Sequence, residues 1–262
     1  MKTWSIHRRE VKLYAKRHFS GSFLKGIFAA ILSFAASLFA LSFVPLQIPV
    51  SFENIPSPRE LVLSFFPDGN LENTIYLLGI SLLLYILLTA PLSIGKHRYY
   101  LMAMRSQKPK FKVVLTPFLN LGQVFSSCAL VVLTAVFEIL LAAILFVIPI
   151  GLLIFSPTLG PLAQIAGLVL YIVAFFMLLI LFTPFAIAPF VLADKPELGA
   201  FKSILLAFKM LRGAKREFLV FDLSFVLWRL LFGVNAPGVF LIEPYITASQ
   251  ARFYDTIDAC KE

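Results

Sequence analysis

Residues 162–192 read LAQIAGLVLYIVAFFMLLILFTPFAIAPFVL, a run without a single charged side chain. A helix rises about 1.5 Å per residue, so this run is longer than the roughly 30 Å hydrocarbon core of a bilayer needs. We therefore expect a tilted or kinked transmembrane helix, with Pro184 and Pro189 as the expected kink sites. The run points to an all-α membrane protein.

The same kind of apolar run recurs along the chain. Hydrophobic residues make up 60% of the 262 residues and charged residues 14%, whereas a soluble domain has about 25% charged residues. We predict a polytopic transmembrane helical bundle that forms a single membrane domain over residues 1–262. About six spans are expected, at about 26–46, 74–94, 124–148, 162–192, 218–234 and 239–251, the last of which is short for a full crossing.

Breaks between the spans are indicated by polar and proline-containing motifs. GKHRYY at 95–100 is expected to stop the second span, and Pro149-Ile150-Gly151 to break the third. The returning segments PLSIGKHRYY, PFAIAPF and PYITASQARFY begin at Pro91, Pro184 and Pro244 and suggest a hairpin used three times. The alternative is that proline is simply common in membrane helices.

The positive charge is distributed in a way that predicts orientation. Of the 23 Lys and Arg residues, seven lie in residues 1–25, six in 95–112 and six in 195–216, whereas the segment 47–73 has only Arg59 among four acidic residues. Short basic loops stay in the cytoplasm, so we expect both termini there and no nucleic acid as a partner of the +9 chain.

Two segments are expected to lie as amphipathic helices on the inner surface of the membrane. Residues 4–19 are basic, with Trp4, Val11 and Tyr14 on one side. Residues 197–213 follow Asp194, an expected N-cap that forms a capping box with Glu197. Anionic lipid headgroups are the expected partners of both helices, together with a membrane protein; the sequence does not give the oligomeric state.

Motifs for chemistry are absent from the sequence. It has no His-Glu-x-x-His helix, no Gly-x-Ser-x-Gly elbow and no phosphate-binding Gly-Lys-Ser/Thr loop. Cys128 and Cys260 have no metal-ligating neighbours at suitable spacing, and the three histidines lie in or beside basic segments. We therefore predict no catalytic residues, no metal, no cofactor and no enzymatic activity.

Charged residues inside the expected spans are the best candidates for a site. A charge costs at least ~2.5 kcal/mol at the centre of the membrane and usually faces a partner or a cavity. Counting residues from the span ends puts Glu138, Arg229 and Glu243 at one depth, which predicts a cluster centred on Arg229. Such a cluster either fixes helix packing or serves transport or binding. Asp222 lies close enough to the end of its span to reach the interface.

The stretch APFVLADKPELGAFKSILLAFKMLRGAKREFLVFDLSFVLWRLLFG (188–233), followed by Pro244-Tyr245 and Phe253-Tyr254, resembles a known family. With PLSIG at 91–95 and IPIG at 148–151, it is similar to the uncharacterised Gram-positive bacterial membrane proteins of the domain of unknown function 975. The resemblance implies a bacterial cytoplasmic membrane and six helices, but no established activity. Arg229 departs from the family pattern, in which an uncharged residue is expected.

Two functions fit these observations. The first is a non-enzymatic scaffold or accessory factor of the cell envelope that acts through lipid or protein partners. The second is a small transporter or lipid-handling permease with a buried charged site, which the proline-broken spans favour. A cavity that reaches Glu138 or Arg229 would favour the second function, and a fully packed core would favour the first.

Overall fold

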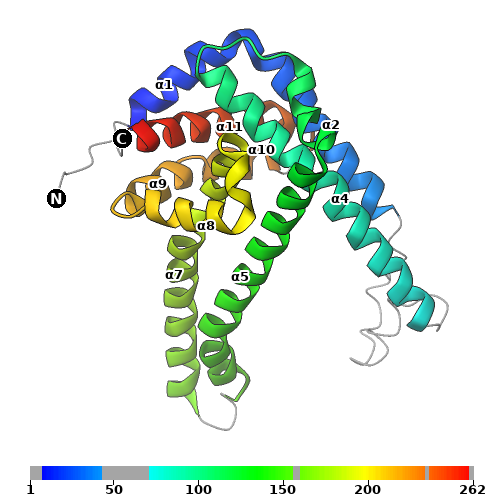
Figure 1. Cartoon of the computed structure of the whole chain (residues 1–262). Coiled ribbons are helices and arrows are strands. Elements are labelled where there is room, and N and C mark those ends of the chain that lie inside the picture. The colour runs from blue at the N-terminus through cyan, green and yellow to red at the C-terminus, as the bar shows by residue number, and fades with distance from the viewer. Residues whose placement is uncertain (1–7, 43–70, 156–159, 234–235, 260–262) are drawn as a thin grey trace.

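A computed structural model of the chain describes residues 8–42, 71–155, 160–233 and 236–259, and all regular elements in these ranges are helices (Figure 1). Its long helices are α2 (Phe23–Leu41), α4 (Leu71–Met104), α5 (Leu121–Ile154), α7 (Pro161–Asp194) and α11 (Ala236–Ala259). The shorter elements are α1 (Arg8–Phe19), η1 (Ser20–Ser22), η2 (Phe111–Leu119), η3 (Pro196–Leu198), α8 (Gly199–Met210), α9 (Lys215–Leu223) and α10 (Val226–Gly233). The all-α prediction is confirmed in coarse outline.

Four of these helices are long and apolar enough to cross a membrane, namely α2, residues 75–104 of α4, α5 and α7. The 19 residues of α2 extend about 28 Å, close to the thickness of a bilayer core. The 34 residues of α5 and of α7 extend about 51 Å, so each helix has residues to spare beyond the core. The predicted number of about six spans is not confirmed.

Within the described part of the fifth predicted span, 218–233, the structure has two short helices. α9 ends at Leu223 and α10 begins at Val226, and at the break the amide of Phe225 donates to the carbonyl of Asp222. The Ser224 hydroxyl donates to the Phe221 carbonyl and accepts a hydrogen bond from the Lys12 ammonium. The sixth predicted span, 239–251, lies within α11, whose second half is buried in protein.

Two of the predicted breaks, GKHRYY and Pro149-Ile150-Gly151, are wrong in their position, whereas Pro184 and Pro189 were expected only as kink sites. α4 continues through GKHRYY to Met104, and α5 continues through Pro149 to Ile154. α7 continues through both Pro184 and Pro189. Pro184 cannot donate to the carbonyl of Ile180, and the Thr183 hydroxyl takes its place at 2.8 Å.

Asp194 is the last residue of α7 and not an N-cap. α7 ends immediately before Lys195-Pro196, as expected because proline disfavours helical geometry in the residue that precedes it. Glu197 lies in η3, and α8 begins at Gly199 without a side-chain cap. The capping box is therefore absent, and the carboxylate of Asp194 has other partners.

The core lies where the three returning helices end. Most buried residues of these helices lie from Ala90 onward in α4, from Thr183 onward in α7 and from Pro244 onward in α11. We call this region, with α1, η2, α8, α9 and α10 around it, the platform (residues 8–22, 90–119, 183–233 and 236–259). The three proline motifs thus mark equivalent places, although α9, α10 and α11 do not repeat the long paired helices of the other two hairpins.

Two hairpins project from the platform and diverge (Figure 1). The α2–α4 hairpin packs through small residues of α2, among them Gly26, Ala29 and Ala30, as is typical of membrane helices. The outer parts of α5 and α7 (131–155 and 160–182), which we call the arm, pack on each other and expose most of their apolar side chains.

α1 and α8 are amphipathic, as predicted, but both pack on protein. α1 buries Val11, Ala15 and Phe19 against its neighbours, which include α11 and α4. α8 buries Ile204 and Ala207 against α5 and α7. Residues 4–7, which belong to the first predicted interfacial helix, lie outside the described residues.

Candidate functional site

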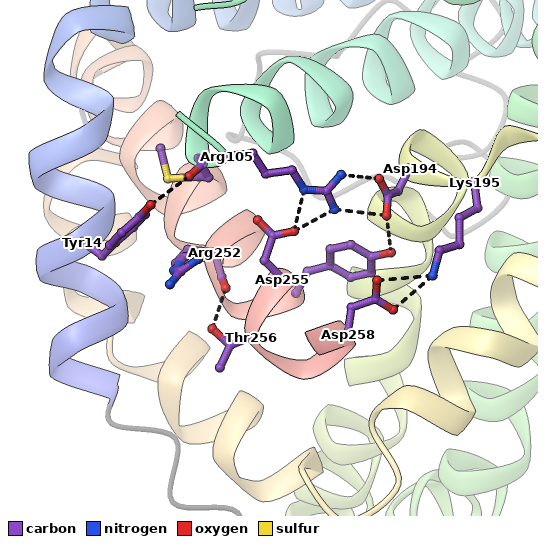
Figure 2. Close-up of polar contacts among 10 residues, drawn as sticks. Tyr14, Arg105, Asp194, Lys195, Arg252, Asp255, Thr256 and Asp258 are labelled. Carbon is purple, nitrogen blue, oxygen red and sulfur yellow. Dashed lines mark hydrogen bonds and ion pairs between the residues drawn. The ribbon is translucent and has the colours of Figure 1, made fainter. Parts of the chain in front are cut away.

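The strongest polar cluster of the platform joins the ends of α4, α7 and α11 (Figure 2). Arg105, directly after α4, donates two hydrogen bonds to the Asp194 carboxylate, with N–O distances of 2.6 and 3.1 Å. It also donates to Oδ1 of Asp255 in α11, from Nε at 3.0 Å and from a terminal nitrogen at 2.8 Å. A planar guanidinium suits this arrangement because its fork can serve two carboxylates at once.

Neighbouring side chains extend the cluster. The Tyr254 hydroxyl donates to Oδ2 of Asp194 at 3.0 Å, and Lys195 pairs with Asp258 at 3.1 Å. Burial raises the pKa of the Asp255 carboxyl above its usual range, and the Arg105 guanidinium opposes this shift. Oδ2 of Asp255 is buried and accepts no hydrogen bond within the described part of the chain.

The pairing of these charges indicates what the cluster does. Arg105 and Lys195 are matched with three aspartates, and each aspartate contacts at least one of the two cations. Over the described ranges, no group of three or more His, Cys, Asp or Glu side chains could hold a metal ion. The cluster therefore cross-links the three returning helices. The sequence showed Asp194 at the end of an apolar run, but not that its partner lies 89 residues earlier.

A second polar region is a cavity of about 360 Å³ between α4, α10 and α11. Its charged lining residues are Lys96, Arg229 and Glu243, and Lys96 forms an ion pair with Glu243. His97 also lines it, with Nδ1 2.6 Å from the Ser93 carbonyl oxygen and its ring edge-on to Phe190. The cavity thus combines a paired lysine and glutamate with an arginine.

The three residues of the predicted charge cluster are only partly brought together. Arg229 and Glu243 line the same cavity, but Arg229 forms a bidentate ion pair with Asp222 at 2.9 and 3.0 Å. Gln250 of α11 donates to the same carboxylate at 2.8 Å. Glu138 lies in α5, half-buried, and forms no ion pair with any residue in the described ranges.

The break between α9 and α10 explains this difference. The depth count assumed one straight helix from Phe218 to Val234, in which Arg229 would lie two turns, about 10 Å along the axis, from Asp222. With the break at Ser224-Phe225, the two side chains face each other seven residues apart. Glu243 similarly meets Lys96, because α4 continues as a helix beyond Gly95.

Comparisons with known proteins agree with the resemblance seen in the sequence. No curated protein and no solved structure matches the chain. One family model matches residues 6–261, which is nearly the whole chain, and its description is "Protein of unknown function (DUF975)". Because this model covers almost the whole chain, the chain belongs to the proteins of unknown function DUF975.

Proposed function

We propose that this protein is a non-enzymatic scaffold or accessory factor of the bacterial cytoplasmic membrane that acts through lipid and protein partners. The platform lies on the cytoplasmic side, because it contains five of the seven cations of segment 1–25 together with the basic segments 95–112 and 195–216. We infer both termini on that side as well, since the four candidate spans among the described residues would return the chain to the side from which it started.

The observation that carries the proposal is the contrast between the platform and the arm. The polar groups of the platform are largely paired with each other, whereas the arm exposes large apolar side chains such as Ile139, at 67%, and Leu168, at 55%. Helices that pack on each other in this way offer their outer faces to lipid or to the spans of another protein. A membrane-embedded docking arm on a rigid base is suited to a scaffold.

Photo-crosslinking in intact cells tests this function. A photoreactive amino acid at Ile139 or Leu168 should form adducts with another membrane protein, seen as a band of higher mass. The matched control is Leu130, which lies in α5 but is only 1% exposed and should give no such band. Adducts with lipid alone at both arm positions would overturn the scaffold.

The second candidate function, a small transporter or lipid-handling permease, is favoured by the cavity at Arg229 and Glu243. A transported group would have to enter this cavity, and the Arg229 guanidinium would be its anchor. In vesicles reconstituted with the full chain, movement of a fluorescent lipid analogue between leaflets, lost in Arg229→Leu, would favour this function over the scaffold.

A further inference from the structure

Two hollows adjoin on the side of the platform where α1 and α2 meet α10 and α11. The first, of about 450 Å³, is lined by four cations of α1, together with residues of α9 and α11. These cations are Arg8, Arg9, Lys12 and Lys16. The second hollow, of about 600 Å³, has a mainly apolar lining formed by Phe19, Phe23, Trp228, Leu241, Ile242 and Tyr245. Lys16 and Tyr245 line both hollows, so the two are neighbours, and we call them together the groove.

The basic half of the groove has an excess of positive charge. Arg8 pairs with Glu217 at 3.1 Å, and Lys12 is held by Ser224 and lies 4.2 Å from the centre of the Phe225 ring. Burial lowers the pKa of Lys12, and the charge of Arg8 adds to this effect. Arg9 and Lys16 are exposed and form no ion pair with any residue that the structure describes. The four cations and the one carboxylate, Glu217, leave a net positive charge in this half of the groove. Such a site suits an anion with oxygen acceptors, such as a phosphate.

The apolar half begins where the basic half ends and follows the start of α2, a helix able to span the membrane. Trp228 and Leu241 are 52% and 50% exposed and form its outer wall. Tryptophan is enriched at the level where headgroups meet acyl chains. A volume of about 600 Å³ lies within the usual range of small-ligand sites, about 300–1,000 Å³.

We propose that this groove binds a single anionic glycerophospholipid, with its phosphate among Arg9, Lys12 and Lys16 and one acyl chain over Phe23, Trp228 and Leu241. The groove requires a ligand that is anionic at one end and apolar at the other, in the order in which a lipid of the inner leaflet presents them. A soluble phosphate compound would leave the apolar half empty. The lipid site specifies one of the lipid contacts of the proposed function. It rests on that function, because it requires the platform to lie on the cytoplasmic side.

Lipid binding to the purified full chain in detergent micelles tests the site. The probes are phosphatidylglycerol, phosphatidylcholine with the same chains, and glycerol phosphate, and retention is measured by mass spectrometry of the intact complex. Phosphatidylglycerol should bind more tightly than phosphatidylcholine, and glycerol phosphate should not compete. The double variant Arg9→Gln/Lys16→Gln should bind phosphatidylglycerol about thirtyfold more weakly, as expected for two cations beside a headgroup.

The control variant is Lys108→Gln/Lys110→Gln, which removes the same charge from exposed positions elsewhere on the platform. It should bind phosphatidylglycerol like the unchanged protein. An equal loss in both double variants would mean non-specific attraction, and equal binding of the two lipids would mean no headgroup site. Competition by glycerol phosphate would mean a site for free phosphate. Any of these results overturns the lipid site, whereas only the crosslinking experiment on the arm tests the scaffold.

Discussion

At the scale of single residues, Gly95 shows how closely the platform is packed. A Cβ atom at Gly95 would lie 1.9 Å from the backbone carbonyl oxygen of Val114 in η2, a contact that only a backbone shift could relieve. Val114 is itself fully buried. Glycine therefore allows α4 and η2 to touch.

We expect Gly95→Ala to destabilise the fold by at least about 1–3 kcal/mol, the usual cost of overpacking. The matched control is Gly79→Ala in the same helix, where a Cβ would meet nothing within 4 Å. That change should be neutral or stabilising by up to about 1 kcal/mol, because alanine is the better helix former. Thermal unfolding in detergent measures both, and equal midpoints for the two variants would contradict the close approach.

Arg105 provides the second test at this scale. Arg105→Leu leaves Asp194 and Asp255 without their cation, and we expect a loss of roughly 2 kcal/mol, less than the ~3–5 for a fully buried pair because the arginine is partly exposed. Arg105→Lys should recover only part of it, since one ammonium cannot copy the guanidinium fork. Lys108→Leu, in an exposed position nearby, is the control and should change the unfolding midpoint little.

A double-mutant cycle measures the interaction between Arg105 and Asp194 separately from the other contacts of the two residues. Arg105→Leu/Asp194→Leu should lose less stability than the sum of the two single changes, because the double variant leaves no unpaired carboxylate at residue 194. Simple additivity would mean that the two side chains do not stabilise each other.

At the scale of elements, hydrophobicity predicted the long apolar helices. It did not predict the helix ends and breaks, where side chains contact other parts of the protein. Long apolar runs identify α2, α4, α5 and α7, because a helix is the means by which such a run satisfies its backbone in lipid. Proline misplaced one boundary, since Pro149 was expected to break its span but lies within the continuous helix α5. Pro184 and Pro189, the expected kink sites, also lie within one continuous helix. Ser224 at the helix break accepts a hydrogen bond from Lys12, more than 200 residues away, a contact that no local pattern could show.

The cavity at Arg229 and Glu243 was partly predicted from the sequence. The cost of a charge in an apolar segment singled out Arg229 and Glu243, and both line one cavity. Their partners, Asp222 and Lys96, depend on the helix break and on the continuation of α4. The Arg105 cluster was missed because Arg105 and Asp255 lie in segments where charged residues are ordinary.

α8 gives a prediction at this scale, because its surface divides into three stripes. Ile204 and Ala207 face the core, Phe201 and Leu205 are more than half exposed, and Lys202 is exposed beside them. For an interfacial helix, spin labels at Phe201 and Leu205 should collide with oxygen more than with a water-soluble nickel reagent, and a label at Lys202 should show the reverse. Equal access of the nickel reagent to all three positions would place the whole outer face of α8 in water.

At the scale of the whole molecule, two hairpins diverge from one platform (Figure 1), and the distribution of charge predicts their orientation. Lys and Arg residues gather at the platform end, and the segment 47–73, which joins the two spans of the first hairpin, is acidic. In a background without Cys128 and Cys260, a cysteine at Asn70 should react with an impermeant maleimide in intact cells. A cysteine at Lys108 should react only after the membrane is permeabilised. The reverse pattern would mean that the protein has the opposite orientation in the membrane.

The number of spans can be decided by the same chemistry. Six spans would carry the end of α10 to the outer face, whereas a four-span protein keeps α9, α10 and α11 with the platform. The structure favours four, because α10 has only 8 residues, about 12 Å of helix, and α11 packs against α1, α4 and α2. Asp222 and Arg229 also pair across the break between α9 and α10.

A cysteine at Gly233, the last residue of α10, should therefore resist the maleimide in intact cells while the cysteine at Asn70 reacts. Labelling of Gly233→Cys from outside, at a rate like that of Asn70→Cys, would support six spans and contradict four.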